Sequence, residues 1–190
     1  MAVSLAMPVM AEKIPLGQIS GYLNALTSAK GAFTQINDDQ SISEGEISIL
    51  RPGRVRFDYA APDNSLVIAG GGQVAVFDPK SNAPPEQFPL NRTPLGLILA
   101  ERVNLNQSNM VVGHNEDGNA TVVRVQDPKN PEYGHIELKF TSDPVQLRQW
   151  VITNDVGDQT TVILRDLDTS VNLRARLFNI VHEIQSRGLN

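Results

Sequence analysis

The chain has 190 residues, 41% of them hydrophobic, a formal net charge of −5 and no cysteine. A chain of this length forms one domain and buries about 70% of the surface that its unfolded form exposes. Its basic residues are scattered, and nucleic-acid binding needs a basic stripe, so that class of function is disfavoured. The lack of cysteine removes disulfides, thiolate metal sites, cysteine nucleophiles and cysteine-linked lipid anchors.

The N-terminus resembles the tail of a secretory signal. Residues 1–11, MAVSLAMPVMA, are apolar and end in Val9-Met10-Ala11 ahead of Glu12. Small or aliphatic residues at the third-last and last positions suit a signal-peptidase site, and the stretch is too short to span a bilayer. We therefore predict a signal remnant over residues 1–11 and a single domain over 12–190. The alternative is a disordered or helical N-terminal tail.

The segment from Pro15 to Ser28 predicts a helix, because apolar residues recur at three- and four-residue steps. Pro15 suits the first turn, where a missing N–H costs nothing. A first strand is expected from Ala32 to Ile36. The apolar stripe of the helix consists of Leu16, Ile19, Leu23 and Leu26.

Two strands on either side of a basic turn are predicted between Gly45 and Pro62. Apolar residues alternate with polar ones along both strands, the period of a strand with one apolar face. Arg51-Pro52-Gly53 predicts the turn, in which Gly53 tolerates a positive φ. The apolar positions are Ile47, Ile49, Val55, Phe57 and Tyr59.

Arg51 follows an apolar pair at the point where strand becomes turn. In one interpretation it is a solvated turn residue. In the other its planar fork of five donors reaches over the apolar face and hydrogen-bonds backbone carbonyls. The residues alone leave both open.

Three consecutive glycines, Gly70 to Gly72, separate a short strand at 66–69 from another at 73–78. A phosphate-binding loop needs a helix behind it, and here a strand follows, so a hairpin turn is predicted. Val74 and Val76 share one face of the second strand.

A loop is expected from Pro79 to Arg92, followed by a short helix from Thr93 to Ala100 with Thr93 as N-cap. A helix of about two turns that is apolar nearly all round must lean on another apolar surface. This pattern is typical both of a mobile flap and of a core helix. Its residues include Pro94, Leu95, Leu97, Ile98 and Leu99.

The remainder of the chain predicts a meander of strands at 110–114, 120–126, 135–141, 147–153, 160–167 and 170–175, with a last helix at 177–189. The spacing indicates a mostly antiparallel α+β fold, in which one strongly curved sheet or partly closed barrel carries helices on its concave side. The apolar concave face forms either a packed core or an apolar cavity.

We find no constellation of catalytic or metal-binding residues. His114, His135 and His182 lie on separate predicted elements without ligand spacing. Nucleophile-elbow and zinc-protease motifs are lacking. We expect no cofactor, no metal and no enzymatic activity, although an exported glycosidase with unrecognised carboxylates stays open.

An ordered set of short motifs resembles the LolA-type periplasmic lipoprotein carriers. The set comprises residues 31–35 (GAFTQ), 45–50 leading into Arg51-Pro52, Phe57-Asp58-Tyr59 followed by Pro62, a glycine turn before 74–77, and Thr93-Pro94-Leu95. The resemblance implies an unclosed barrel whose concave apolar face is lidded by helices.

The resemblance also implies a function. The cavity would take lipoprotein acyl chains from an inner-membrane lipoprotein-releasing transporter and pass them to an outer-membrane acceptor lipoprotein, with the protein acting as a periplasmic monomer. Arg51 would latch the lid to the barrel. The cavity candidates are Leu23, Leu26, Phe33, Ile47, Ile49, Val55, Phe57, Tyr59, Val74, Val76 and Trp150.

Two further hypotheses use the same fold. An outer-membrane acceptor would need a lipidated N-terminal cysteine, which this sequence lacks. An interaction or sensor module would recognise a protein segment without carrying lipid.

Overall fold

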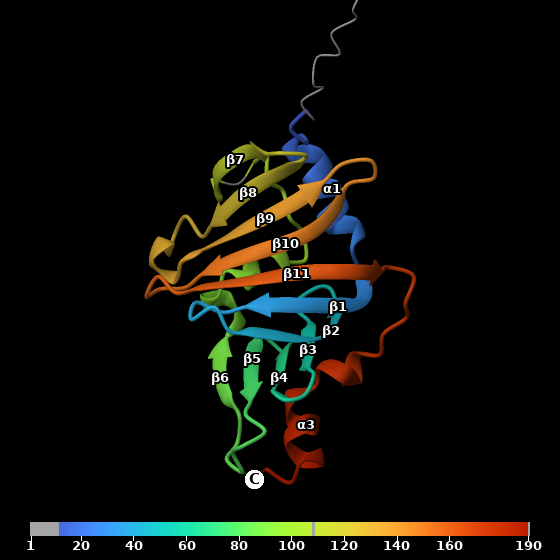
Figure 1. Ribbon diagram of the computed structural model, residues 1–190, viewed down its shortest axis with the longest axis vertical. Coiled ribbons are helices and arrows are strands. Elements are labelled where there is room, and N and C mark those ends of the chain that lie inside the picture. Colours follow the sequence, from blue (N-terminus) through green and yellow to red (C-terminus); the bar gives the residue numbers. More distant parts are fainter. Residues whose placement is uncertain (1–11, 108, 190) are drawn as a thin grey trace, which may run out of the picture.

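The computed structural model describes residues 12–107 and 109–189. It is built on an 11-stranded antiparallel sheet in the order β6-β5-β4-β3-β2-β1-β11-β10-β9-β8-β7 (Figure 1). Two meanders, β1–β6 and β7–β11, are joined where β1 pairs with β11. Because β6 and β7 each have a neighbour on one side only, the curved sheet stays unclosed. The predicted fold class is confirmed.

The strands of the first meander are β1 (Ser28–Ile36), β2 (Ile42–Leu50), β3 (Val55–Tyr59), β4 (Leu66–Gly70), β5 (Gln73–Phe77) and β6 (Glu86–Pro89). Those of the second are β7 (Val111–Asp117), β8 (Ala120–Gln126), β9 (His135–Thr141), β10 (Gln146–Thr153) and β11 (Gln159–Asp168). The α-helices are α1 (Leu16–Ala25), α2 (Leu95–Ile98) and α3 (Ile180–Ser186). Short 3₁₀ helices are η1 (Leu90–Arg92), η2 (Pro131–Tyr133) and η3 (Ala175–Phe178). No helix in the described part of the chain is long and apolar enough to cross a membrane.

Side-chain alternation divides the sheet into two faces. On β3, Val55 and Phe57 are buried on the face that α1 and α2 cover, here called the inner face. Arg56 and Asp58 lie on the other side, the outer face, where Arg56 pairs with Glu183 of α3. The period of two that predicted β3 therefore also decides which residues meet which helix.

Aromatic contacts connect the two meanders across the inner face. Phe57 packs edge-to-face against Phe33 of β1, with ring centroids 5.3 Å apart, and against Trp150 of β10, at 6.3 Å. Each such pair contributes about 0.5–1.5 kcal/mol beyond its buried area. Phe33 and Trp150 are fully buried, so these contacts hold β1, β3 and β10 around one core.

The outer face carries a second, smaller core under η3 and α3. Phe178 and Ile180 pack on alternating residues of β4 and β5: Leu66, Ile68, Ala75 and Phe77. A Cβ at Gly70 would lie 2.0 Å from the carbonyl oxygen of Phe178, so only glycine admits this approach. The last predicted helix is thus present, shorter than expected, and it lies on the face opposite α1 and α2.

Other boundaries differ from the predictions for local reasons. The helix expected over 93–100 is only α2, Leu95–Ile98. No strand forms at 170–175, because the Asp168 carboxylate accepts hydrogen bonds from both the N–H and the hydroxyl of Ser170, and this turns the chain out of the sheet. The loop expected over 79–92 contains β6 and η1.

The glycine turn is a hairpin, as predicted. Gly71 and Gly72 have φ values of 59° and 79°, which join β4 to β5 in a two-residue turn. Gly53 has φ of 71°, the positive value expected for the turn after Arg51. The predicted signal remnant, residues 1–11, lies outside the described residues.

Candidate functional site

The inner face is closed by a short lid, defined here as residues 93–100. Its side chains Leu95, Ile98 and Leu99 are 8%, 6% and 3% exposed and belong to the main core. Four helical residues have no stability of their own in water, so the lid is held by this apolar contact. Each fully buried aliphatic side chain contributes about 1.5–3 kcal/mol.

Glycine at position 96 has a packing reason. A Cβ there would lie 2.6 Å from the carbonyl oxygen of Leu90, so the lid crosses η1 at a distance that only glycine allows. The hydroxyl of Thr93 donates to the same carbonyl at 2.8 Å instead of capping α2. The predicted N-cap role of Thr93 is therefore wrong, and Pro94 occupies that position.

Arg51 connects the turn after β2 to the end of the lid. Its backbone N–H donates to Thr27 at 2.8 Å, which fixes the main chain, and its Nη2 donates to the carbonyl oxygen of Ala100 at 2.5 Å. Next to it, the N–H of Gly53 donates to the carbonyl oxygen of Leu99 at 2.8 Å. Two hydrogen bonds thus join this turn to the last residues of the lid.

The Arg51 guanidinium is unusual because it is buried among apolar side chains. The residue is 9% exposed, and removal from water lowers its pKa from the usual value. Its Nε is buried without a hydrogen-bond partner, one of two such side-chain atoms among the described residues. An orphaned buried donor costs about 1–3 kcal/mol, more when it is charged.

A small cavity of about 20 Å³ lies between the lid and the sheet. Its volume is near that of one water-sized probe, so this cavity has no room for an acyl chain while the lid is in place. The cavity is lined by Leu23, Leu26, Ile49, Arg51, Val55, Leu95, Ile98, Leu99, Leu147 and Trp150.

Eight of the cavity candidates are buried together in the main core: Leu23, Leu26, Phe33, Ile47, Ile49, Val55, Phe57 and Trp150. Tyr59 and Val74 are partly buried against it. Leu97 of the lid is also partly buried there.

Val76 differs from the other candidates. It is 36% exposed, because β5 lies one strand from the free edge and its neighbour there is Glu86 of β6. Phe88, also on β6 and paired with Val74, is 46% exposed. By strand alternation and pairing, both side chains lie on the same face of the sheet as Val74. The inner face therefore extends beyond the lid as an exposed apolar margin, formed by Val76 and Phe88. Val76 belongs to this margin and not to the buried cavity.

Several inner-face residues were missed by the sequence analysis. The second meander contributes as much of the face as the first, through the alternating positions of β8, β9 and β10. The signal was present in the alternation of Ile136, Leu138 and Phe140, but sequence alone does not show which meander faces which helix. The added residues are Val123, Val125, Ile136, Leu138, Phe140 and Leu147.

The chain after the lid is fastened to α1. The Asn24 side chain donates to the carbonyl oxygen of Val103 at 2.8 Å and accepts from its N–H at 2.9 Å. Two residues later, the N–H of Leu105 donates to the Ser20 hydroxyl at 3.0 Å. The lid therefore lies between a segment that is hydrogen-bonded to α1 and the turn at 51–53.

A polar contact marks one end of the inner face. The Tyr59 hydroxyl donates to Oε1 of Gln35 at 2.7 Å. Burial and the nearby carboxylate of Asp63 raise the pKa of Tyr59 to about 12. The phenol therefore stays neutral at physiological pH and adds no charge to the apolar face.

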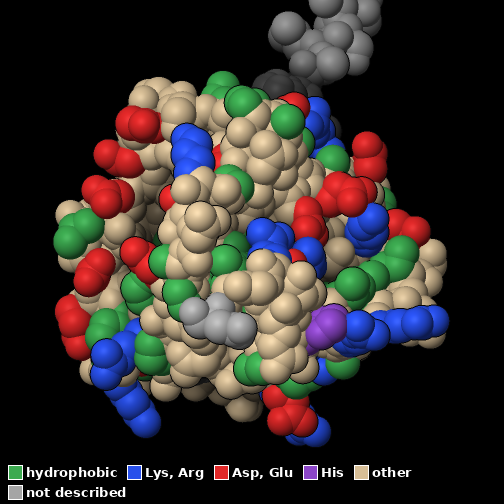
Figure 2. Space-filling view, turned by 90° about the horizontal axis from the view of Figure 1, so that it is seen from below, with side chains coloured by type: hydrophobic (Ala, Val, Ile, Leu, Met, Phe, Trp, Pro, Cys, Tyr) green, Lys and Arg blue, Asp and Glu red, His purple; other side chains and the backbone are tan. Residues whose placement is uncertain are grey.

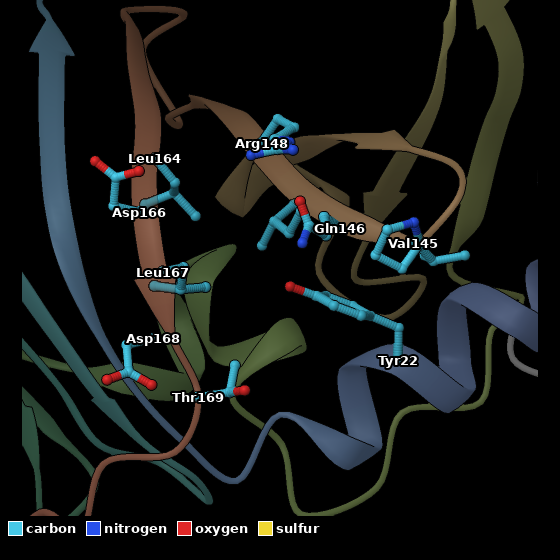
Figure 3. Close-up of a pocket in the computed structure, with 11 residues that line it drawn as sticks. Tyr22, Val145, Gln146, Arg148, Leu164, Asp166, Leu167, Asp168 and Thr169 are labelled. Atoms are coloured by element: carbon cyan, nitrogen blue, oxygen red, sulfur yellow. The ribbon is translucent and has the colours of Figure 1, made fainter.

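A second hollow, of about 490 Å³, lies beside α1 near the ends of β10 and β11 (Figure 3). Tyr22 points from α1 toward Gln146, and Asp166 and Asp168 lie across the hollow from it (Figure 3). Burial raises the pKa of Tyr22. Its charged and amide lining suits water better than acyl chains. Of the two, the small cavity under the lid has the more apolar lining, with Arg51 as its one charged residue.

The end of the molecule seen in Figure 2 carries Lys and Arg interspersed with Asp and Glu, with no field of a single sign. Among the described residues no group of three or more His, Asp or Glu side chains could hold a metal ion.

Residues 24–181 match the family model described as outer membrane lipoprotein carrier protein LolA. The chain belongs to the LolA family. It is 27% identical over 171 residues to an outer-membrane lipoprotein carrier protein of Pseudomonas aeruginosa, covering 85% of this chain and 80% of the relative. The counterpart from Methylococcus capsulatus is 24% identical over 180 residues, covering 88% and 84%.

Among solved structures, a LolA superfamily protein from Nitrosomonas europaea aligns with 87% of this chain and 98% of its own, at a TM-score of 0.49 and 9% identity. The LolA match begins inside α1 and ends inside α3. The lid and the Arg51 turn therefore lie well within the region that defines the family.

Proposed function

We propose that this LolA-family protein is a periplasmic carrier that binds the acyl chains of lipoproteins on its inner face and ferries them from the inner to the outer membrane. The carrier names of its relatives support the class of function. The observation that carries the proposal is the buried apolar face closed by a lid that has no stability of its own. Such a face is a ligand site held in its empty state.

The energies are of the right order for reversible loading. Opening the lid exposes three aliphatic side chains and breaks the bonds at Arg51 and Gly53. Each methylene of an entering chain gains about 0.8 kcal/mol, so a chain of about fifteen methylenes gains on the order of 10 kcal/mol. On the same scale the closed lid is worth about 6–13 kcal/mol, which is comparable with this gain. Loading and closure therefore lie close in free energy, which allows loading and also release to a better acceptor.

Arg51 is the latch in this proposal. Its hydrogen bond to Ala100 is charge-assisted and contributes roughly 1.5–3 kcal/mol to the closed state. A contribution of this size favours the closed lid over the open one and still allows the lid to open. The partners we propose are the lipoprotein acyl chains, an inner-membrane releasing transporter and an outer-membrane acceptor lipoprotein, with no catalytic step.

The test is mass spectrometry of the protein purified from its native periplasm without detergent. We expect triacylated lipoprotein to co-purify with it. Co-purification of a non-lipidated protein segment instead would favour the interaction-module hypothesis. Recovery of the protein with neither partner, while a known LolA carrier treated in parallel retains lipoprotein, would contradict the carrier function.

A further inference from the structure

Arg51 has more hydrogen-bonding capacity than the closed lid uses. The guanidinium has five N–H donors. Among the described residues, the only acceptor of its side chain is the Ala100 carbonyl oxygen, which is bonded to Nη2, and Nε is buried with no partner. The other nine residues around the cavity are apolar. A single latch bond does not require a fork buried in this way, because an exposed arginine could reach the same carbonyl.

Opening the lid makes the deficit larger. The Ala100 carbonyl moves away with the lid, and among the described residues it is the only acceptor to which the Arg51 side chain donates in the closed protein. A guanidinium that is buried among apolar groups without any hydrogen-bond acceptor is strongly disfavoured. The loaded state therefore needs an oxygen on the ligand itself.

The ligand that fits has a long apolar part and a carbonyl oxygen at its head. We propose that Arg51 recognises the ester carbonyl of a bound acyl chain, exchanging the carbonyl of Ala100 for that of the lipid as the lid opens. This rests on the proposed carrier function. It assigns Arg51 two alternating acceptors, a protein carbonyl when the site is empty and a lipid carbonyl when it is loaded.

The exchange has a consequence for specificity. Purely hydrocarbon contacts do not distinguish an acyl ester from an alkyl ether of the same length. A cationic donor inside the cavity does, because the ether lacks the carbonyl oxygen and leaves the donor unpaired. Esterified lipids and free fatty acids both offer the carbonyl. We assign an esterified lipid because the acyl chains of the proposed cargo are esters, and free palmitate is tested against this assignment.

The experiment compares a synthetic triacylated lipopeptide with its analogue in which both glyceryl esters are ethers, using the full chain and calorimetric titration. We expect the wild-type protein to bind the ester form at least tenfold more tightly. In Arg51→Met this ratio should fall to one or below. Both ligands require the lid to open. The cost of breaking the Arg51–Ala100 bond therefore cancels in the ratio of the two affinities.

Arg54→Met is the matched control. Arg54 lies on the same turn and donates to the carbonyl oxygen of Leu50 at 3.1 Å, but it does not line the cavity. It should keep the wild-type ratio. With ¹³C-labelled ester carbonyls, the carbonyl stretch should shift to lower frequency on binding to wild type and not on binding to Arg51→Met.

Equal affinity of wild type for ester and ether lipopeptides would overturn this inference and leave the carrier function standing. Failure to bind either lipopeptide would overturn both. Palmitate and methyl palmitate, used as competitors, separate the two sources of the carbonyl: stronger competition by the methyl ester supports esterified lipid, and stronger competition by palmitate overturns that assignment. If Arg51→Met fails to fold, the wild-type ratio and the infrared shift still decide.

Discussion

The Nη2 of Arg51 donates to the carbonyl oxygen of Ala100, 49 residues further along the chain, at 2.5 Å. This contact joins the turn between β2 and β3 to the end of a lid that covers the inner face. Because Arg51 directly follows β2 and Ala100 comes two residues after α2, this bond is present only when the lid is closed. The account of loading and release depends on it.

Arg51→Leu should favour the open lid, because the closed state loses a charge-assisted bond of roughly 1.5–3 kcal/mol. We expect acceptance of lipoprotein from inner-membrane vesicles to persist, because burial of the acyl chains outweighs any single contact of Arg51 with the lipid. Onward transfer to purified acceptor should fall, because the bond that favours closure is lost. Arg51→Lys should recover part of the transfer, since a point charge replaces the planar fork. A folded Arg51→Leu protein that transfers at the wild-type rate would show that Arg51 is only a turn residue.

The lid should exchange amide hydrogen faster than the sheet beneath it. Its amides at Leu97 and Leu99 are held by a single helical turn, whereas those of β3 belong to ladders with β2 and β4. Hydrogen exchange of the empty protein should therefore show lower protection over 95–99 than over 55–59. Equal protection in the two segments would mean that the helix is fixed core.

Gly96→Ala tests the close crossing of the lid and η1. Alanine is the better helix former by about 0.5–1 kcal/mol, so a lid limited only by helix propensity would become more protected. The added Cβ would instead meet the carbonyl oxygen of Leu90 at 2.6 Å. We expect faster exchange over 95–99. Gly21→Ala, at a helical glycine with open space around its Cβ position, is the control and should not affect the lid.

Acid should loosen α3 from the outer face. Burial raises the pKa of Glu183, but hydrogen bonds from Arg187 and Arg56 outweigh it and lower that pKa overall. A lowered carboxyl pKa adds stability that is present above the unfolded-state value and is lost as pH falls through the folded value. The decline should therefore begin near pH 4 to 5, about the unfolded-state pKa of Glu.

Urea unfolding of wild type and Glu183→Gln at several pH values measures this contribution. We expect the glutamine variant to be less stable at neutral pH and to show a shallower loss toward acid. Glu86→Gln, at an exposed glutamate of β6, serves as control. Parallel pH profiles for wild type and Glu183→Gln would show that the ion pairs with Arg56 and Arg187 do not hold α3.

Alternation predicted most of the fold, because a period of two assigns both the strand and the face. Val55 and Phe57 show this on β3, and β8 and β9 have the predicted bounds. The strand expected at 170–175 failed because a local Asp168–Ser170 turn overrides the β-propensity of Val171. The order of the two meanders could not be derived, since nothing in one strand specifies its neighbour.

The sequence indicated the candidate site less completely than the fold. Arg51 stood out because it followed an apolar pair before a turn, but its acceptor, Ala100, belongs to another segment and is a backbone atom without a sequence signal. The uncovered margin at Val76 depends on how far the lid reaches, which no local pattern records. The second core under α3 required knowing that Gly70 approaches Phe178.

The most direct test of the central claim is hydrogen exchange of the full chain with and without a synthetic triacylated lipopeptide. We predict that the lipopeptide lowers the protection of the amides of Gly53, Leu97 and Leu99 while those of 55–59 stay protected, because cargo occupies the inner face only after the lid lifts. Tight binding with unchanged exchange at all three amides would contradict the account, since the lipid would then be bound elsewhere than under the lid.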